Sequence, residues 1–425
     1  MFNNYAMYDY EITESAEQAA SGELKLSLSD LEFLLGRTVD LSNSQKLKDE
    51  LIFGVFRKLL DAVDCDDDDE FEHIFDAVSR IQRSNIDDAL FALDILAKNN
   101  ISFTENRYYG GDRTTLRDWL LESVFSLGLL ERMKRLGVDL NEALTDGKTP
   151  AYIIAEREFS EKCPWTDRDI EEELAGAVSF FSMESMEKLT AEGTSAVHAA
   201  VKNNHFKMLE AMIKAGINVN LTEDQPCVTG TTLLHKACRY GSIEAVRLLI
   251  EAGADDTLLD GNEESPAHAV LFCNYLTGSK SLGTEERAEL LRELRNVDRT
   301  GKYGRTPMMA ALDCDDYDIS NKLAPVFIEK GADVNHADNF GYTPLMLGGG
   351  MGTVKALVSA GADVNARNRE GNTPLHFALE RGGSQEAAYL IKKGADFNAA
   401  NDEGVTPMQL VVEKGFEELL LLMGL

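Results

Sequence analysis

One short phrase recurs along the chain and limits the folds that the chain can adopt. It combines a glycine, a threonine-proline pair and an apolar run, and its clearest copies are GRTPMMAAL at Gly304, GYTPLMLG at Gly341, GNTPLHFAL at Gly371 and GVTPMQLVV at Gly404. Weaker copies begin at Asp112, Gly147, Gly193, Gly230 and Glu263. Successive copies are 30 to 46 residues apart, which is typical of arrays of stacked helical units.

Each copy has the composition of a helix start. Threonine is a good N-cap, and proline fits the first helical position. A second apolar stretch follows, such as IEAVRLLIE at Ile243–Glu251, with apolar residues at the helical period. A second phrase then ends the unit, as in GADVN at Gly331 and Gly361, where glycine suits the left-handed position after a helix. One unit buries too little apolar surface to be stable alone, so we expect the units to stack.

The pattern resembles the ankyrin repeat, clearly over residues 193–425 and in weaker form back to about Ile86. This resemblance implies an all-α fold, an α-solenoid of helix-turn-helix units with short turns, whose concave groove binds other proteins. We expect a helical N-terminal cap at 1–85, degenerate ankyrin-like repeats at 86–192 with an insertion at 156–175, and ankyrin repeats at 193–425 with insertions near 274–286 and 313–318. A separate functional domain at 1–85 is the alternative to a cap.

The repeat that begins at Thr343 is shorter than its neighbour. It reads TPLMLGGGMGTVKALVSAGADVN, which is 23 residues, whereas the same stretch from Thr373 takes 26. The three missing residues fall where the first helix should end, so Gly348, Gly349 and Gly350 are expected to replace its last turn and the connection. Glycine tolerates the unusual dihedral angles that such a shortcut needs. A phosphate-binding loop is not expected, because no GKS or GKT follows the glycines.

The resemblance places the groove at the variable turn residues before each threonine-proline pair and at the exposed end of each first helix. The protein-binding residues expected on this basis are Arg239, Tyr240, Tyr303, Arg305, Phe340, Tyr342, Arg369, Glu370, Arg381, Asp402 and Glu403. Trp165, a tryptophan in a polar insertion, is a further interface candidate. Tyr, Arg and Trp are the residue types that dominate binding hot spots. The alternative is that the aromatic turn residues pack on the neighbouring turn.

Motifs for catalysis or metal binding are not found in the sequence. The acidic run Asp64–Glu70 lacks the glycine and the glutamate of a twelve-residue calcium loop. Four histidines share one slot of the repeat phrase, and the resemblance implies that they form hydrogen bonds between neighbouring units; they are His198, His235, His268 and His376. We therefore expect no enzymatic activity, no cofactor and no metal site.

The net charge of −31 is the strongest compositional fact. Such a surface repels nucleic acid and favours association with a basic protein. No apolar run is long enough to span a membrane, and the polar N-terminus lacks the features of a signal peptide. Six scattered cysteines indicate reduced thiols. We expect a cytoplasmic monomer that binds neither nucleic acid nor membrane.

These observations predict a non-catalytic scaffold that binds another protein through the groove. A sharper hypothesis is an acidic inhibitor or immunity protein, similar to an antitoxin, that masks a basic toxin or nuclease. Two alternatives stay open: an ankyrin-repeat effector that is secreted into a host cell, and an enzyme whose activity lies in the N-terminal region.

Overall fold

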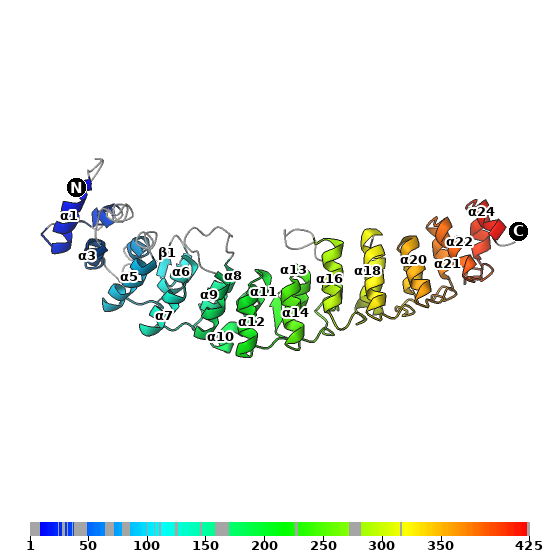
Figure 1. Ribbon diagram of the computed structural model, residues 1–425, viewed down its shortest axis with the longest axis horizontal. Coiled ribbons are helices and arrows are strands. Elements are labelled where there is room, and N and C mark those ends of the chain that lie inside the picture. The colour runs from blue at the N-terminus through cyan, green and yellow to red at the C-terminus, as the bar shows by residue number, and fades with distance from the viewer. Residues whose placement is uncertain are drawn as a thin grey trace. The chain divides into compact units, whose positions relative to one another are not determined.

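The repeated phrase starts a helix at every copy from Gly147 onward in the computed structural model (Figure 1). Thr306 caps α17 (Pro307–Leu312) by accepting the N–H of Met309 at 3.3 Å, and Pro307 is the first helical residue. Thr406 caps α23 (Pro407–Glu413) in the same way. The predicted helix starts are thus confirmed. The glycines of the second phrase adopt positive φ angles throughout, so their predicted left-handed conformation is confirmed as well.

The structure describes most of the chain, which divides into two compact units, Met1–Ala191 and Glu192–Leu425. It describes residues 9–23, 25–27, 30–31, 33–35, 37, 49–63, 72–78, 86–99, 101–105, 107–109, 112–123, 126–144, 147–157, 170–225, 228–271, 282–314 and 317–422. Trp165 and the acidic run Asp64–Glu70 lie outside these ranges. This division does not test the predicted boundary between residues 85 and 86, which stays a prediction.

The unit Glu192–Leu425 consists of two rows of helices. The first row comprises α11 (Ala196–Lys202), α13 (Leu233–Tyr240), α15 (Pro266–Ala269), α17, α19 (Pro344–Leu347), α21 (Pro374–Glu380) and α23. The second row comprises α12 (Phe206–Ala215), α14 (Ile243–Glu251), α16 (Thr284–Glu293), α18 (Tyr317–Glu329), α20 (Gly350–Ser359), α22 (Ser384–Lys392) and α24 (Glu417–Leu422). Each helix contacts its neighbours in the same row, and Figure 1 shows α14 to α22 of the second row side by side. The helices are therefore called first or second helices by row.

Buried histidines connect successive repeats in this unit. The Nδ1 atom of His235 is 2.8 Å from the hydroxyl of Thr232, the N-cap of the same helix, and its Nε2 is 2.9 Å from the carbonyl oxygen of Glu264 in the next repeat. His376 repeats the arrangement with Thr373 at 2.9 Å and the carbonyl oxygen of Val405 at 3.2 Å. The predicted structural role of the histidine slot is confirmed for both residues.

The unit Met1–Ala191 is also built mainly of helices. They include α1 (Asp9–Ser21), α3 (Asp49–Leu60), α5 (Ile86–Lys98), α6 (Leu116–Ser123), α7 (Leu127–Arg135), α8 (Pro150–Glu156), α9 (Ile170–Ala177), the 3-10 turn η1 (Val178–Phe180) and α10 (Met183–Glu187). Neighbours pack in the order α1, α3, α5, α7 and α9, so α1 and α3 extend the row of helices. A buried ion pair, Arg117 Nε to Asp118 Oδ1 at 2.7 Å, lies in α6, and Arg117 also donates to the carbonyl oxygen of Asp139.

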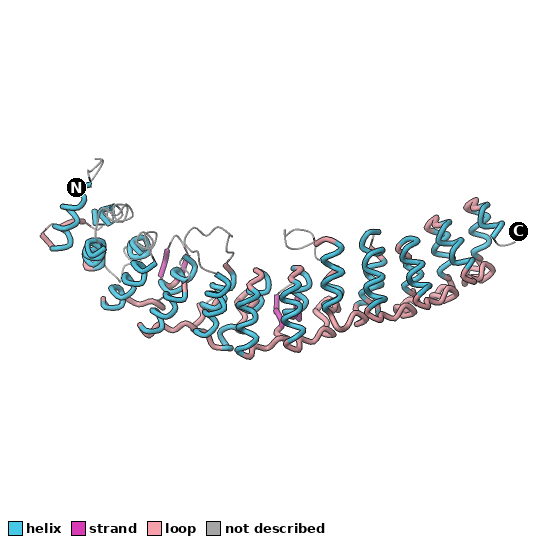
Figure 2. The backbone as a smooth tube through the Cα atoms, viewed as in Figure 1, coloured by secondary structure: helices cyan, strands magenta, loops and turns pink. Residues whose placement is uncertain are grey.

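Two β-hairpins replace turns that the sequence predicted to be short. β1 (Arg107–Tyr109) pairs with β2 (Asp112–Thr114), and β3 (Thr222–Gln225) pairs with β4 (Val228–Thr232); both pairs are antiparallel and are drawn in magenta in Figure 2. The expected all-α class holds for the rest of the described chain. The second hairpin contains few apolar residues, so its segment lacks the hydrophobic alternation that predicts a strand.

Candidate functional site

The turns that precede the first helices are joined to one another by backbone hydrogen bonds. The N–H of Asn339 donates to the carbonyl oxygen of Tyr303 at 2.9 Å, and the N–H of Arg369 donates to that of Phe340 at 3.0 Å. Within one turn, Asp338 Oδ1 accepts the N–H groups of Phe340 and Tyr342. Side chains at equivalent turn positions are therefore held next to each other along one surface. We call this surface, made by the turns and the C-terminal ends of the first helices, the first-helix face.

Two aromatic side chains are exposed at neighbouring turn tips of this face. Tyr303 is 53% exposed and Phe340 is 48% exposed. Their ring centroids are 6.0 Å apart, and Lys302 Nζ lies 5.2 Å from the centroid of the Tyr303 ring. Tyr303, in the 3-10 turn η2 (Lys302–Gly304), has a φ of 61°, which is uncommon for a residue other than glycine. These rings, the aromatic turn pair, pack on each other and still leave about half of their surface to a partner.

The three glycines shorten one first helix, as the sequence predicted. The helix α19 has four residues, whereas α17 has six and α21 has seven. Gly348, Gly349 and Gly350 have φ angles of 92°, 112° and 84°, and α20 begins at Gly350. A side chain at 348 would also collide with Arg381, because a Cβ atom there would lie 2.7 Å from Nη2. The chain therefore turns at once from the first helix into the second.

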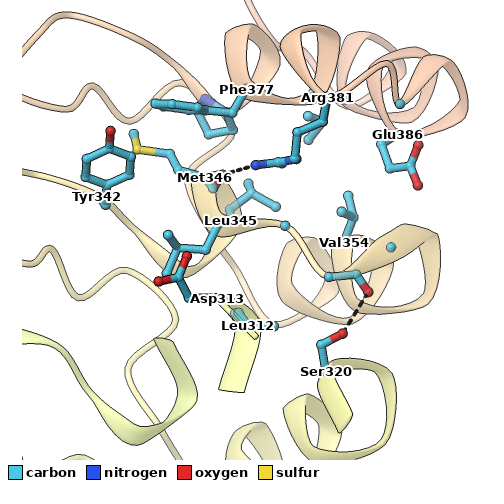
Figure 3. A pocket seen from close by; sticks show the side chains of 18 of the residues that line it. Leu312, Asp313, Ser320, Tyr342, Leu345, Met346, Val354, Phe377, Arg381 and Glu386 are labelled. Carbon is cyan, nitrogen blue, oxygen red and sulfur yellow. Dashed lines mark hydrogen bonds between the residues drawn. The ribbon is translucent and has the colours of Figure 1, made fainter. Parts of the chain in front are cut away.

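A cavity of about 380 Å³ lies beside this shortened helix (Figure 3), and we call it the glycine pocket. Its apolar lining comes from three successive repeats: Leu312, Leu345, Met346, Leu347, Val354, Pro374, Phe377, Ala378 and Leu390. Tyr342 and Phe377 pack with ring centroids 5.3 Å apart at one side of the pocket. Partial burial, together with the charge of Glu370, raises the pKa of the Tyr342 phenol, so this hydroxyl stays neutral and can donate a hydrogen bond.

Charged side chains surround the pocket on both sides. Arg381 Nη1 donates to the carbonyl oxygen of Met346 at 2.7 Å, which satisfies one acceptor of the shortened helix. Arg305 forms ion pairs with Asp313 and, at 3.3 Å, with Asp338. Asp313 and Glu386 also line the pocket, and the Asp313 side chain is 51% exposed. Arg305 and Arg381, which the sequence predicted as binding residues, thus also hold the walls of this site together.

The other predicted binding residues are dispersed. Arg369, Glu370, Asp402 and Glu403 are exposed at the next two turn tips. Arg239 is only 14% exposed and lies 3.6 Å from Asp260, so most of its side chain is unavailable to a partner. Tyr240 is partly buried, and burial, with the negative charge of Glu223, raises its pKa. Trp165 lies outside the described residues.

A buried ion pair in Glu192–Leu425 was not predicted from the sequence. Lys236 on α13 pairs with Glu223 on β3, and Glu223 also accepts the hydroxyl of Thr194 at 2.8 Å. Burial lowers the pKa of Lys236, whereas the charge of Glu223 opposes that effect. The two side chains are only 8% and 6% exposed, which favours a structural role in fixing the hairpin. No sequence signal identifies the pair, because the hairpin that buries it was not predicted.

The described part of the chain contains no group of three or more His, Cys, Asp or Glu side chains placed to hold a metal ion. Within the same residues, no helix has the length and apolar character needed to cross a membrane.

Comparisons with known proteins agree with this repeat architecture. Residues 171–260 and 348–423 match the family model for ankyrin repeats in three copies. The chain is 29% identical over 165 residues to the nuclear factor NF-kappa-B p105 subunit of Gallus gallus, covering 37% of this chain and 15% of that protein. It is 29% identical over 155 residues to a protein of Fowlpox virus (strain NVSL) named as an ankyrin repeat protein, FPV031, covering 35% of this chain and 41% of that protein.

The chain therefore spans less than half the length of these relatives. A solved structure, the ankyrin repeat domain of Bcl-3, described as a unique member of the IkappaB protein family, matches with 24% identity and a TM-score of 0.42, covering 52% of this chain and 94% of that chain. The matched family model, the capped helix pairs and the histidine links between repeats lead to one conclusion: the chain contains ankyrin repeats, which the family model places at residues 171–260 and 348–423.

Proposed function

We propose that the chain is a non-catalytic scaffold that binds another protein through the first-helix face of Glu192–Leu425. The observation that carries this proposal is the aromatic turn pair, Tyr303 and Phe340, which is about half exposed and is held in place by the backbone bonds between turns. Tyrosine and other aromatic residues dominate the binding energy of protein interfaces. Tyr342 and Arg381 line the glycine pocket on the same face, and Arg305 pairs with Asp313 of its lining.

We further propose that the partner is a basic protein. The net charge of −31 would speed its association, because opposite charges steer the encounter of two proteins. Neutralisation of a basic toxin or nuclease is the form of this function that the charge favours. The scaffold is proposed to act as a monomer in the cytoplasm, with residues 1–85 as a cap.

The proposal is tested by removing the aromatic turn pair. The double substitution Tyr303→Ala and Phe340→Ala should weaken binding of a purified partner by at least about 2 kcal/mol, the usual scale of a hot spot. Tyr389→Ala is the matched control, because Tyr389 lies on the second helix α22. Binding is measured by calorimetry, and the helical content of each variant by circular dichroism.

Equal affinity of the double variant and the unsubstituted chain would refute binding through the aromatic turn pair. Loss of binding in the Tyr389→Ala variant instead would move the interface to the second helices.

A further inference from the structure

The glycine pocket marks a position at which the array lacks a side chain that its neighbours possess. Six residues after the N-cap threonine, the repeat of Thr306 has Leu312 and the repeat of Thr373 has Leu379. Both leucines are buried, with 3% and 0% of their surface exposed. The repeat of Thr343 has Gly349 at this position. The shortened repeat therefore omits a buried aliphatic side chain, and the cavity lies next to the turn that is missing.

The lining of the cavity suits an aliphatic group. Leu345, Met346, Val354 and Leu390 are buried and form its apolar wall, and Leu347 and Phe377 are partly exposed beside them. A volume of about 380 Å³ lies within the range of ligand pockets, roughly 300 to 1,000 Å³, and is ample for one large aliphatic side chain. Burial of a leucine side chain contributes enough free energy to anchor a partner.

The charges around the pocket indicate which residues flank that side chain in the partner. Arg305 lies between Asp313 and Asp338, so its charge is offset within the protein. Glu386 lines the pocket, and Glu380 is exposed one residue before Arg381. Arg381 is hydrogen-bonded to the carbonyl oxygen of Met346. Carboxylates thus outnumber guanidinium groups at the pocket, and the whole chain is strongly acidic, which complements a basic segment.

We propose that the glycine pocket receives one leucine-sized aliphatic side chain from a basic segment of the protein partner. The inference rests on the proposed function and names the anchor of that same interface. The partner segment supplies an aliphatic group to the cavity beside the shortened helix, and its basic residues face Asp313, Glu380 and Glu386.

The pocket can be filled without changing the rest of the face. In the repaired variant, the four residues Leu347–Gly350 are replaced by the seven-residue sequence of Phe377–Gly383, which restores the length of the neighbouring repeat. A second variant, Ala378→Leu, places a leucine on the pocket wall and serves if the repaired chain does not fold. The double variant Tyr303→Ala and Phe340→Ala leaves the pocket lining unchanged and is the control.

The probes are three acetylated and amidated peptides, KKLKK, KKAKK and EELEE, added to the full chain with 13C-labelled methionine methyl groups. The Met346 resonance, assigned with a Met346→Leu variant, reports on the pocket. We expect KKLKK to shift this resonance saturably with a dissociation constant on the order of 1 mM. KKAKK should bind about tenfold more weakly, because one buried leucine is worth about that factor or more. EELEE should bind more weakly than KKLKK as well.

The shift should vanish in the repaired or Ala378→Leu chain and persist in the Tyr303→Ala and Phe340→Ala control. An unchanged Met346 resonance with KKLKK, a shift that survives in the filled variants, or equal binding of EELEE would each overturn the proposal. A protein partner that binds the repaired chain with full affinity but not the control variant would leave the proposed function intact and remove the pocket from it.

Discussion

Acidification should destabilise the unit Glu192–Leu425 through its buried histidines. Burial lowers the pKa of His198 and of His268 from 6.5 to about 4. Burial also lowers the pKa of His235 and of His376. In the unfolded chain these histidines take up protons near pH 6.5, whereas in the folded chain His198 and His268 resist protonation down to about pH 4. Their contribution to stability is therefore complete above about pH 6.5 and is lost as the pH falls toward 4.

The magnitude follows from the lowered pKa values. One pH unit of pKa difference corresponds to 1.36 kcal/mol, so a pKa lowered from 6.5 to about 4 amounts to about 3 kcal/mol of folding free energy for each of His198 and His268. Both side chains are almost fully buried, so solvent screening reduces this figure little. Loss of a few kcal/mol is a large fraction of the stability of an ordinary domain.

The chain itself supplies the substitution that tests this reasoning. In the last repeat the histidine slot holds Gln409, whose Oε1 accepts the N–H of Thr406 at 2.8 Å, as Nδ1 of the histidine does in other repeats. A His198→Gln, His268→Gln variant should therefore keep the cap bonds but lack the titrating groups. Urea unfolding of both chains between pH 7 and pH 4, followed by circular dichroism, gives the free energies of unfolding.

The variant should lose several kcal/mol less than the unsubstituted chain over this pH range. Carboxylates titrate in both chains, so the difference between the two profiles isolates the histidines. Parallel profiles would refute the reasoning, because they would show that the buried histidines take up protons without cost to the fold.

Two further predictions concern structural contacts. Lys236→Met alone should destabilise the chain by about 3 to 5 kcal/mol, because it leaves Glu223 buried without its counter-ion. The double variant Lys236→Met and Glu223→Leu should recover most of that loss. Urea unfolding measures the stability of both variants, and equal stability would contradict the assignment. Thr149→Ala should lower the free energy of unfolding by about 1 kcal/mol, since the Thr149 hydroxyl accepts the Tyr152 N–H. Thr149→Ser keeps this hydroxyl and should not lower it. Equal thermal midpoints for the two variants would argue against the cap.

The fold was predictable because each repeat contains its own local sequence signals for helix starts and ends. Threonine caps, proline at the first helical position and glycine at the left-handed position act within a few residues, and the histidine slot repeats at a readable spacing. The hairpin β3–β4 was not predictable in this way. Its strands are polar, and its side of the array is stabilised by the pair Lys236–Glu223, whose partners are 13 residues apart and carry no periodic signal.

The candidate site was predictable only in part. Tyr303 and Phe340 were placed correctly at neighbouring turns, because the turn is the variable part of each repeat. Arg239 was expected to be available to a partner, but its ion pair with Asp260 buries it, and a charge partner in the next turn is invisible in a local pattern. The shortened helix was predicted from the glycines. The cavity beside it was not, because its lining depends on Phe377 and Leu390 from the following repeat.

The repeat of Thr343, which departs from the pattern of its neighbours, says more about function than the regular repeats do. A repeat array gains stability when every unit contributes the same buried side chains. The repeat of Thr343 gives up a helical turn and the leucine of its neighbours, and it retains three glycines with positive φ angles that disfavour any other residue. Such a loss of packing would be compensated if a partner supplies the missing contact. The aromatic turn pair lies on the adjacent turns of the same face, so one bound segment would contact both features.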